Sequence, residues 1–186
     1  MRRCVVLILA VFGCAALASA QIPTGGNIYV GYSYFNTNMV GTDRQGLNGW
    51  EGSIEGKFFP FVGIVADFSA NYGDLKGPNP GATCPVGVIC GPLNVNSHVD
   101  NLLFGPRVSV SVGRIRPFAE AMFGAAHINT NGFGSDTSFA TALGGGLDYR
   151  IFHLLAWRFE GDFIRSDLFH NTQHNARFTT GIVFRF

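Results

Sequence analysis

The sequence predicts an all-β protein, specifically an eight-stranded, antiparallel, up-and-down transmembrane β-barrel. Apolar and polar residues alternate with a period of two over most of the chain after residue 20, which is typical of strands with two different faces. No run of 18 apolar residues occurs there, so no helix is expected to span a membrane. Long and short connections also alternate along the chain, which is the plan of an outer-membrane barrel.

The composition argues against several other classes of protein. Of the 186 residues, 47% are apolar and only 13% are charged, whereas soluble domains carry about 25% charged residues. The apolar and aromatic content argues against disorder, and the 25 glycines with scarce charge argue against a coiled coil. A net charge of +1 without a basic cluster argues against nucleic-acid binding. A single domain is expected at this length.

The first twenty residues have the pattern of a secretory signal peptide. A positive start precedes a short apolar run, and Ala18-Ser19-Ala20 fits a small-x-small cleavage site. A transmembrane anchor is disfavoured because the apolar run is short. A lipoprotein is disfavoured because Val11-Phe12-Gly13, the residues before Cys14, fit the lipoprotein cleavage motif poorly. We therefore expect residues 1–20 to be cleaved and residues 21–186 to form the barrel domain.

Two cysteines remain after this cleavage. Cys84 and Cys90 are separated by five residues, and in an oxidising compartment such a pair indicates a small loop-closing disulfide. A metal site would need further ligands nearby, and the surrounding segment GATCPVGVICGPLN has none. A disulfide between the two cysteines is the favoured interpretation.

Alternation places the eight strands in order. They are expected over residues 27–36, 47–59, 62–73, 98–113, 116–128, 138–150, 156–166 and 174–186. The long, polar connections are residues 37–46, 74–97, 129–137 and 167–173, and the short ones are residues 60–61, 114–115 and 151–155. In such barrels the short turns face the periplasm and the long loops face outside.

One face of each strand is suited to lipid. Every second residue from Val62 to Tyr72 is apolar or aromatic, and the same holds for one face of the first and fourth strands. Aromatic residues near strand ends fit interfacial girdles; they are Tyr32, Tyr34, Trp50, Phe58, Tyr72, Tyr149, Trp157, Phe184 and Phe186.

The opposite face carries charges of both signs in equal number. The predicted interior salt-bridge network comprises seven acidic and seven basic residues: Glu51, Glu55, Asp67, Glu120, Asp148, Glu160, Asp162, Lys57, Arg107, Arg116, Arg150, Arg158, Arg177 and Arg185. Buried charges must be paired, and side chains fill the interior of an eight-stranded barrel. These charges therefore indicate a packed core and not a pore lining.

A soluble β-barrel or sandwich is the main competitor, because its strands also have one apolar and one polar face. Few charges and many Ser, Gly and Asn residues occupy the polar face, which would make a poor water-facing surface. The transmembrane interpretation is therefore favoured.

The last strand, Phe178 to Phe186, carries Phe178, Ile182, Phe184 and Phe186 at alternate positions. It resembles the assembly signal of bacterial outer-membrane proteins, which the insertion machinery recognises. Together with the segments IYVGYSY and RPFAE, the chain resembles small OmpA/OmpX-type barrels over essentially all of residues 21–186. The resemblance implies a place in the outer membrane of a Gram-negative-type bacterium.

Some barrels of this size are enzymes that modify lipid A with a Ser- or His-centred site. The candidate residues are His127, His153, His170, His174, Ser138, Ser166 and Asp167. They show no diagnostic order or spacing, and we expect solvated loop residues. A metal site at His170 and His174 would need a helix, and the residues between them predict a loop. No catalytic, cofactor or metal site is expected.

The expected function is therefore a structural or surface-contact role through the long outer loops, without chemistry. Residues 74–97 form the longest loop and the best recognition site. The alternatives are a lipid A-modifying enzyme and, less favoured, a narrow channel. Expected partners are outer-membrane lipids, the assembly machinery and an unknown extracellular ligand, with no nucleic acid; the protein is expected to be a monomer.

Overall fold

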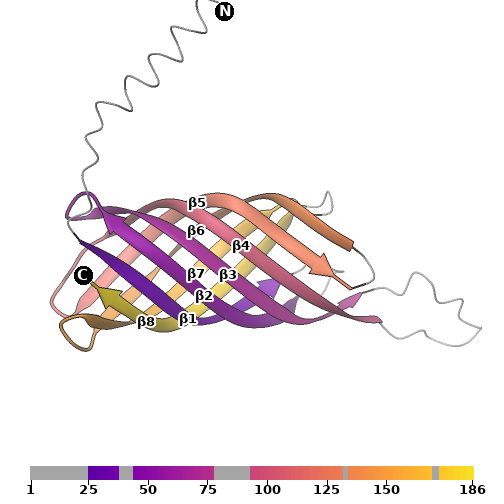
Figure 1. The fold of residues 1–186 in the computed structure, drawn as a ribbon, viewed down its shortest axis with the longest axis horizontal. Helices are drawn as coiled ribbons and strands as arrows, with labels where there is room; N and C mark the ends of the chain where they lie inside the picture. Colours follow the sequence, from indigo (N-terminus) through magenta and orange to yellow (C-terminus); the bar gives the residue numbers. More distant parts are fainter. Residues whose placement is uncertain (1–24, 38–43, 78–92, 132–133, 169–171) are drawn as a thin grey trace, which may run out of the picture.

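The computed structural model describes residues 25–37, 44–77, 93–131, 134–168 and 172–186, which form a closed barrel of eight strands (Figure 1). The strands are β1 (Gly25–Thr37), β2 (Gln45–Lys57), β3 (Val62–Gly77), β4 (Leu93–Ser109), β5 (Ile115–Thr130), β6 (Gly134–Arg150), β7 (Leu155–Ser166) and β8 (Gln173–Arg185). Each strand pairs antiparallel with the next, and β1 pairs with β8 to close the barrel. The predicted fold class is confirmed. Within the described ranges, no helix is long and apolar enough to cross a membrane.

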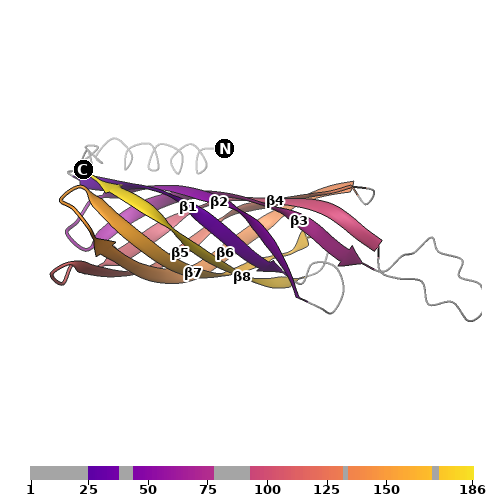
Figure 2. The same ribbon diagram turned by 90° about the horizontal axis from the view of Figure 1, so that it is seen from below.

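The two ends of the barrel differ (Figures 1 and 2). The short connections 58–61, 110–114 and 151–154 lie at one end, together with Gly25 and Phe186; we call this the turn end and the opposite one the loop end. Gly113 has φ of 62° in the tight turn between β4 and β5, a backbone conformation that favours glycine because it has no Cβ.

The hairpin of β3 and β4 is longer than the sequence predicts. Residues 74–97 are expected to form a loop, yet the ladder continues to the pair Gly77 and Leu93. The physical reason is that the alternation persists, because Leu75 and Val95 face each other across the ladder and are both buried inside the barrel. The Gly, Asp and Asn residues around them conceal this pattern in the sequence.

The outward face is apolar over a band that starts at the turn end. On β3 the band runs from Val62 to Tyr72, and on β4 and its following turn it runs from Leu102 to Val112. Ten residues that rise about 3.3 Å each, on a strand tilted by about 40°, span about 25 Å, the height of the apolar band of outer-membrane barrels. Asp100 and other polar residues lie beyond it towards the loop end. The barrel is therefore built to span a membrane.

Candidate functional site

The inward face divides the bore into two layers. Towards the turn end the bore holds mostly charged side chains, and towards the loop end it holds a buried apolar cluster together with uncharged polar side chains such as Asn71, Asn101 and Asn175. The cluster consists of Phe35, Leu47, Val65, Leu75, Val99, Leu103, Met122, Ala126, Ile128, Ala140, Ala142, Ile164 and Leu168. The sequence analysis assigned the inward face to charges and missed this layer. The sequence does indicate this apolar cluster, because Leu47 lies on the same face of β2 as Glu51, and Leu103 lies on the same face of β4 as Arg107.

Arg177 on β8 is the centre of one part of the charged layer. Its guanidinium is fully buried and lies 2.7 Å from Asp162, 2.7 Å from Asp67 and 3.4 Å from Glu51. It also donates a hydrogen bond to Ser69 at 3.0 Å. One arginine therefore joins carboxylates from β2, β3 and β7 across the bore.

Arg107 on β4 makes a second centre. Its Nε donates to Glu120 on the neighbouring strand, and its other nitrogens lie 3.4 Å from Glu160 and 3.5 Å from Glu55. The guanidinium carbon also lies 4.5 Å from the ring centre of Phe118, within the range of a cation–π contact. Arg107 thereby links β2, β5 and β7.

Arg158 and the residues near the turn end complete the network. Arg158 binds Asp148 through two hydrogen bonds of 2.7 and 3.2 Å, and it lies 3.5 Å from Glu160. Arg185 lies 3.3 Å from Asp148, and Arg116 lies 2.9 Å from Glu55. The charged layer thus runs without a break from the middle of the bore to its mouth.

Of the fourteen residues predicted to form the interior network, three are not buried in the bore. Eleven are buried in the bore, whereas Arg185 and Lys57 lie at its mouth and are partly exposed. Arg150 is exposed outside the bore, where it donates a hydrogen bond to the backbone oxygen of Gly113, because it is the last residue of β6. Within the described residues the ion pairs join seven carboxylates to five arginines: Arg107, Arg116, Arg158, Arg177 and Arg185. Carboxylates therefore outnumber arginines by two in these ion pairs, whereas the sequence predicts equal numbers of acidic and basic residues.

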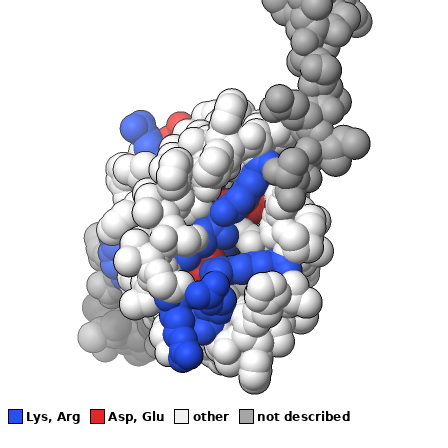
Figure 3. Space-filling view, turned by 90° about the vertical axis from the view of Figure 1, so that its left-hand side faces the viewer, with Lys and Arg blue, Asp and Glu red and all other residues white. Residues whose placement is uncertain are grey.

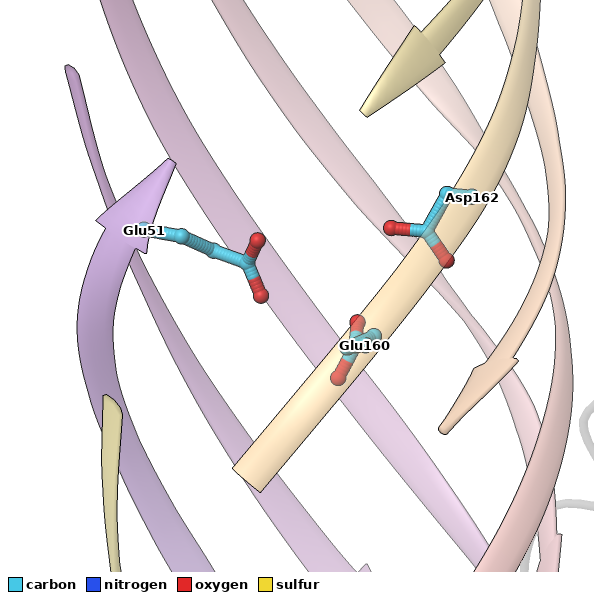
Figure 4. Close-up of side chains that lie close together, drawn as sticks. All are labelled: Glu51, Glu160 and Asp162. Carbon is cyan, nitrogen blue, oxygen red and sulfur yellow. The ribbon is translucent and has the colours of Figure 1, made fainter. Parts of the chain in front are cut away.

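Three of these carboxylates form a compact acidic cluster. Glu51 on β2 points across the bore towards Glu160 and Asp162 on β7 (Figure 4), and oxygens of the three lie within 4.8 Å of one another. Carboxylate oxygens are ligands for hard cations. Here, however, Glu51 and Asp162 are ion-paired with Arg177, and Glu160 is ion-paired with Arg107 and Arg158. We therefore assign the cluster to the ion-pair network.

Glycine provides the space that this network needs. A Cβ at Gly144 on β6 would overlap an oxygen of the Asp162 side chain, and one at Gly31 on β1 would overlap the hydroxyl of Tyr29. Asp162 and Gly144 are direct partners in the ladder between β6 and β7. The glycines facing the bore therefore make room for larger side chains of neighbouring strands.

The residues considered for lipid chemistry are not brought together. His127 Nδ1 lies 2.7 Å from Thr137 Oγ1 on the outward face near the loop end. Asp100 is the ladder partner of His127, but its carboxylate lies 2.7 Å from His98 Nε2 instead. Asp100 therefore does not supply the carboxylate that would orient the His127 ring in a catalytic triad. The sequence analysis did not single out His98, Asp100 or Thr137.

The other candidates lie apart from this pair. Ser138 and Ser166 face the bore, His174 faces outward, and His153 lies in a turn at the opposite end. Asp167 accepts a hydrogen bond from Thr172 at 2.6 Å. His170 lies outside the described residues, as do the predicted signal peptide and the predicted disulfide of Cys84 and Cys90. Those predictions remain predictions.

The predicted assembly stripe lies on the outside of β8. Phe178, Phe184 and Phe186 are exposed on the outward face, and Ile182 is half-exposed in the same row. The backbone N–H of Gly26 donates to the Phe186 oxygen at 2.9 Å, so the last residue takes part in closing the barrel.

The comparisons with known proteins agree with this geometry. No protein-family model and no curated protein matches the sequence. Solved structures of other proteins do match the fold. Neisserial surface protein A matches with a TM-score of 0.63 at 8% identity, over 87% of this chain and 97% of that chain. Ail, the attachment invasion locus protein of Yersinia pestis, solved in complex with a heparin analogue, matches with a TM-score of 0.58 at 13% identity, over 87% and 98%.

The outer membrane protein OprG from Pseudomonas aeruginosa matches with a TM-score of 0.54 at 11% identity, over 89% of this chain and 97% of that chain. Identities this low show the fold and not the activity. The protein has the fold of the small eight-stranded β-barrels of bacterial outer membranes.

Proposed function

We propose that the protein is a closed outer-membrane barrel that acts at its loop end, in envelope structure or surface contact, and performs no chemistry. The observation that carries this proposal is the filling of the bore. Ion pairs centred on Arg107, Arg158 and Arg177 occupy the turn half, and the apolar cluster and buried uncharged polar side chains occupy the loop half. Side chains that fill a narrow barrel leave no path for solutes, so function falls to the loops and the outer wall.

The loop end is suited to surface contact because a rigid scaffold carries it. The paired strands β3 and β4 hold the two ends of segment 78–92, from Gly77 to Leu93. Binding residues are commonly found on loops that such a scaffold positions. In this proposal the turn end faces the periplasm, the assembly machinery inserts the chain as a monomer, and segment 78–92 contacts a ligand outside the cell.

The test replaces residues 78–92 by a short Gly-Ser linker in cells that otherwise lack the protein. A difference in gel mobility between unboiled and boiled samples confirms that the variant barrel folds. We expect the linker variant to lose adhesion to immobilised extracellular glycans and proteins while it restores resistance of the envelope to detergent. The proposal fails if deletion of the whole protein changes neither adhesion nor detergent resistance.

A lipid A-modifying activity is the second candidate, and the outward pair of His127 and Thr137 is the observation that favours it. Its test is a mass spectrum of lipid A from cells with the wild-type protein, with His127→Ala and without the protein. We expect three identical spectra. A mass change that requires His127 would replace the proposed function by an enzymatic one. Single-channel recordings test the closed bore, and current steps from the wild-type protein would contradict it.

A further inference from the structure

The turn end is apolar where a water-facing end would be polar. Phe59 and Phe61 in the first turn are 65% and 57% exposed, and Phe152 and Leu154 in the third turn are 68% and 58% exposed. The outward apolar band reaches the second turn at Val112, which is 66% exposed. The tips of the turns therefore lie at the level of the lipid headgroups and not in bulk water, since exposed apolar and aromatic residues are favoured at that interface.

Two arginines meet at this end. The backbone N–H of Arg150 donates to the Arg114 oxygen at 2.8 Å, and the Arg150 guanidinium donates to the Gly113 oxygen at 2.8 Å. Both arginines are exposed. Neither takes part in an ion pair among the described residues. Figure 3 shows basic side chains around the hollow of this end, with acidic atoms deeper inside the hollow.

No Asp or Glu among the described residues lies within ion-pair distance of Arg114 or Arg150. Seven of the described acidic residues are held in the bore by ion pairs. The other four, Asp74, Asp100, Asp136 and Asp167, lie towards the loop end. Residues 1–24 contain no Asp or Glu. Arg114 and Arg150, whose backbones are joined by a hydrogen bond beside the apolar turns, are therefore available to an anion from outside the protein.

We propose that Arg114 and Arg150 bind the phosphate of an anionic glycerophospholipid in the leaflet that surrounds the turn end. Arginine is well suited to phosphate because its planar donors can bind two oxygens at once. An apolar groove of about 400 Å³ on the same end, lined by Phe152, His153, Leu154, Leu155 and Phe184, can receive the adjoining acyl chain. A soluble polyanion would match the arginines, but the exposed phenylalanines and leucine favour a lipid.

The two tryptophans of the chain provide matched probes. Trp157 faces lipid on β7, next to Ala156, which is the ladder partner of Arg150. Trp50 faces lipid on β2, towards the loop end. The variant Trp50→Phe therefore reports lipids near the arginine pair, and Trp157→Phe reports lipids away from it. Each is refolded into vesicles that contain brominated phosphatidylglycerol or brominated phosphatidylcholine, and quenching of fluorescence gives the relative binding constant of the two lipids.

We expect Trp157 to show a several-fold preference for phosphatidylglycerol, because one basic residue near an anionic surface is worth about fivefold. Adding Arg114→Gln and Arg150→Gln should bring the ratio to about one, and salt should weaken the preference by screening. The control pair Arg44→Gln and Arg165→Gln removes the same charge at the loop end and should leave the ratio unchanged.

Three results would overturn the lipid site. One is equal binding of phosphatidylglycerol and phosphatidylcholine at Trp157 in the protein that retains both arginines. This result would favour a soluble polyanion as the ligand of the arginines. Another is an equal preference at Trp50, which would indicate a general effect of vesicle charge. The third is a preference that survives the loss of Arg114 and Arg150. All variants keep the bore intact, and the gel-mobility difference checks that each one folds.

Discussion

The replacement Arg177→Met tests the ion-pair network at its most connected residue. Methionine keeps much of the length of the side chain but removes its charge and all its donors. Asp162 and Asp67, both at 2.7 Å, then lose their closest cation, and Glu51 loses its 3.4 Å partner. Removal of one partner of a buried ion pair costs about 3–5 kcal/mol. Since three carboxylates are left without this partner, we expect a loss of at least about 3 kcal/mol.

The assay is urea unfolding of the barrel refolded in phosphatidylcholine vesicles, which lack the anionic lipid that Arg150 is proposed to bind, followed by the fluorescence of the lipid-facing Trp50 and Trp157. With a slope of about 2 kcal/mol per molar urea, a loss of about 3 kcal/mol lowers the midpoint by about 1.5 M. The matched control is Arg150→Met, because Arg150 lies outside the bore with one hydrogen bond to a backbone oxygen. It should change stability by no more than about 0.5 kcal/mol.

Equal losses in the two variants would refute the assignment of Arg177 to the inside and Arg150 to the outside. Should Arg177→Met fail to fold, addition of Asp67→Asn and Asp162→Asn supplies the decisive comparison. This triple variant should recover folding, because the two closest unpaired charges are gone. Continued failure would show that Arg177 acts through its packing and not through its charge.

Three further predictions concern neighbouring features. Glu51→Gln should leave the urea midpoint within about 0.25 M of wild type, because the Glu51 carboxylate has one 3.4 Å ion pair and accepts no hydrogen bond from the described residues. A loss of stability like that of Arg177→Met would show instead that the network depends on the charge of Glu51. Gly144→Ala should lower the free energy of unfolding by about 1–3 kcal/mol, because the new Cβ displaces Asp162. Gly52→Ala is the control and should leave stability unchanged, because a Cβ there meets nothing nearer than 3.6 Å. Equal losses of stability in the two variants would refute the role of Gly144. Deletion of Phe186 should lower the amount of assembled barrel in cells, measured by gel mobility, and unchanged assembly would remove this residue from the signal.

The sequence predicts the strand number and the inward charges because both follow from local alternation. On β7, Trp157, Phe159 and Phe163 alternate with Arg158 and other charged residues, and the structure puts the two sets on opposite faces. Lipid outside and a narrow polar bore inside make this alternation stricter than in most soluble sheets, so it can be recognised without any alignment.

The partners within the bore could not be predicted, because they depend on closure and on strand tilt. Arg177 meets Asp67 across a separation of 110 residues, and no local pattern encodes that contact. The sequence predicts that the strand ends at residue 150, and β6 does end there. Alternation places Arg150 in the same row as the buried Asp148, but it does not show that the last side chain of the row is exposed at the mouth of the bore. The extension of β3 and β4 was hidden because Leu75 and Val95 stand among turn-forming residues.

The unbroken ladder of β3 and β4 has a consequence for what the cell can present. From Tyr72 to Gly77 the hairpin continues for five residues beyond the apolar band, a rise of about 13 Å. Any sequence inserted between Gly77 and Leu93 would thus start from a stiff post above the headgroup layer. We therefore expect that a segment exchanged for residues 78–92 would be held above the membrane without a change to the part of the chain that assembles in it.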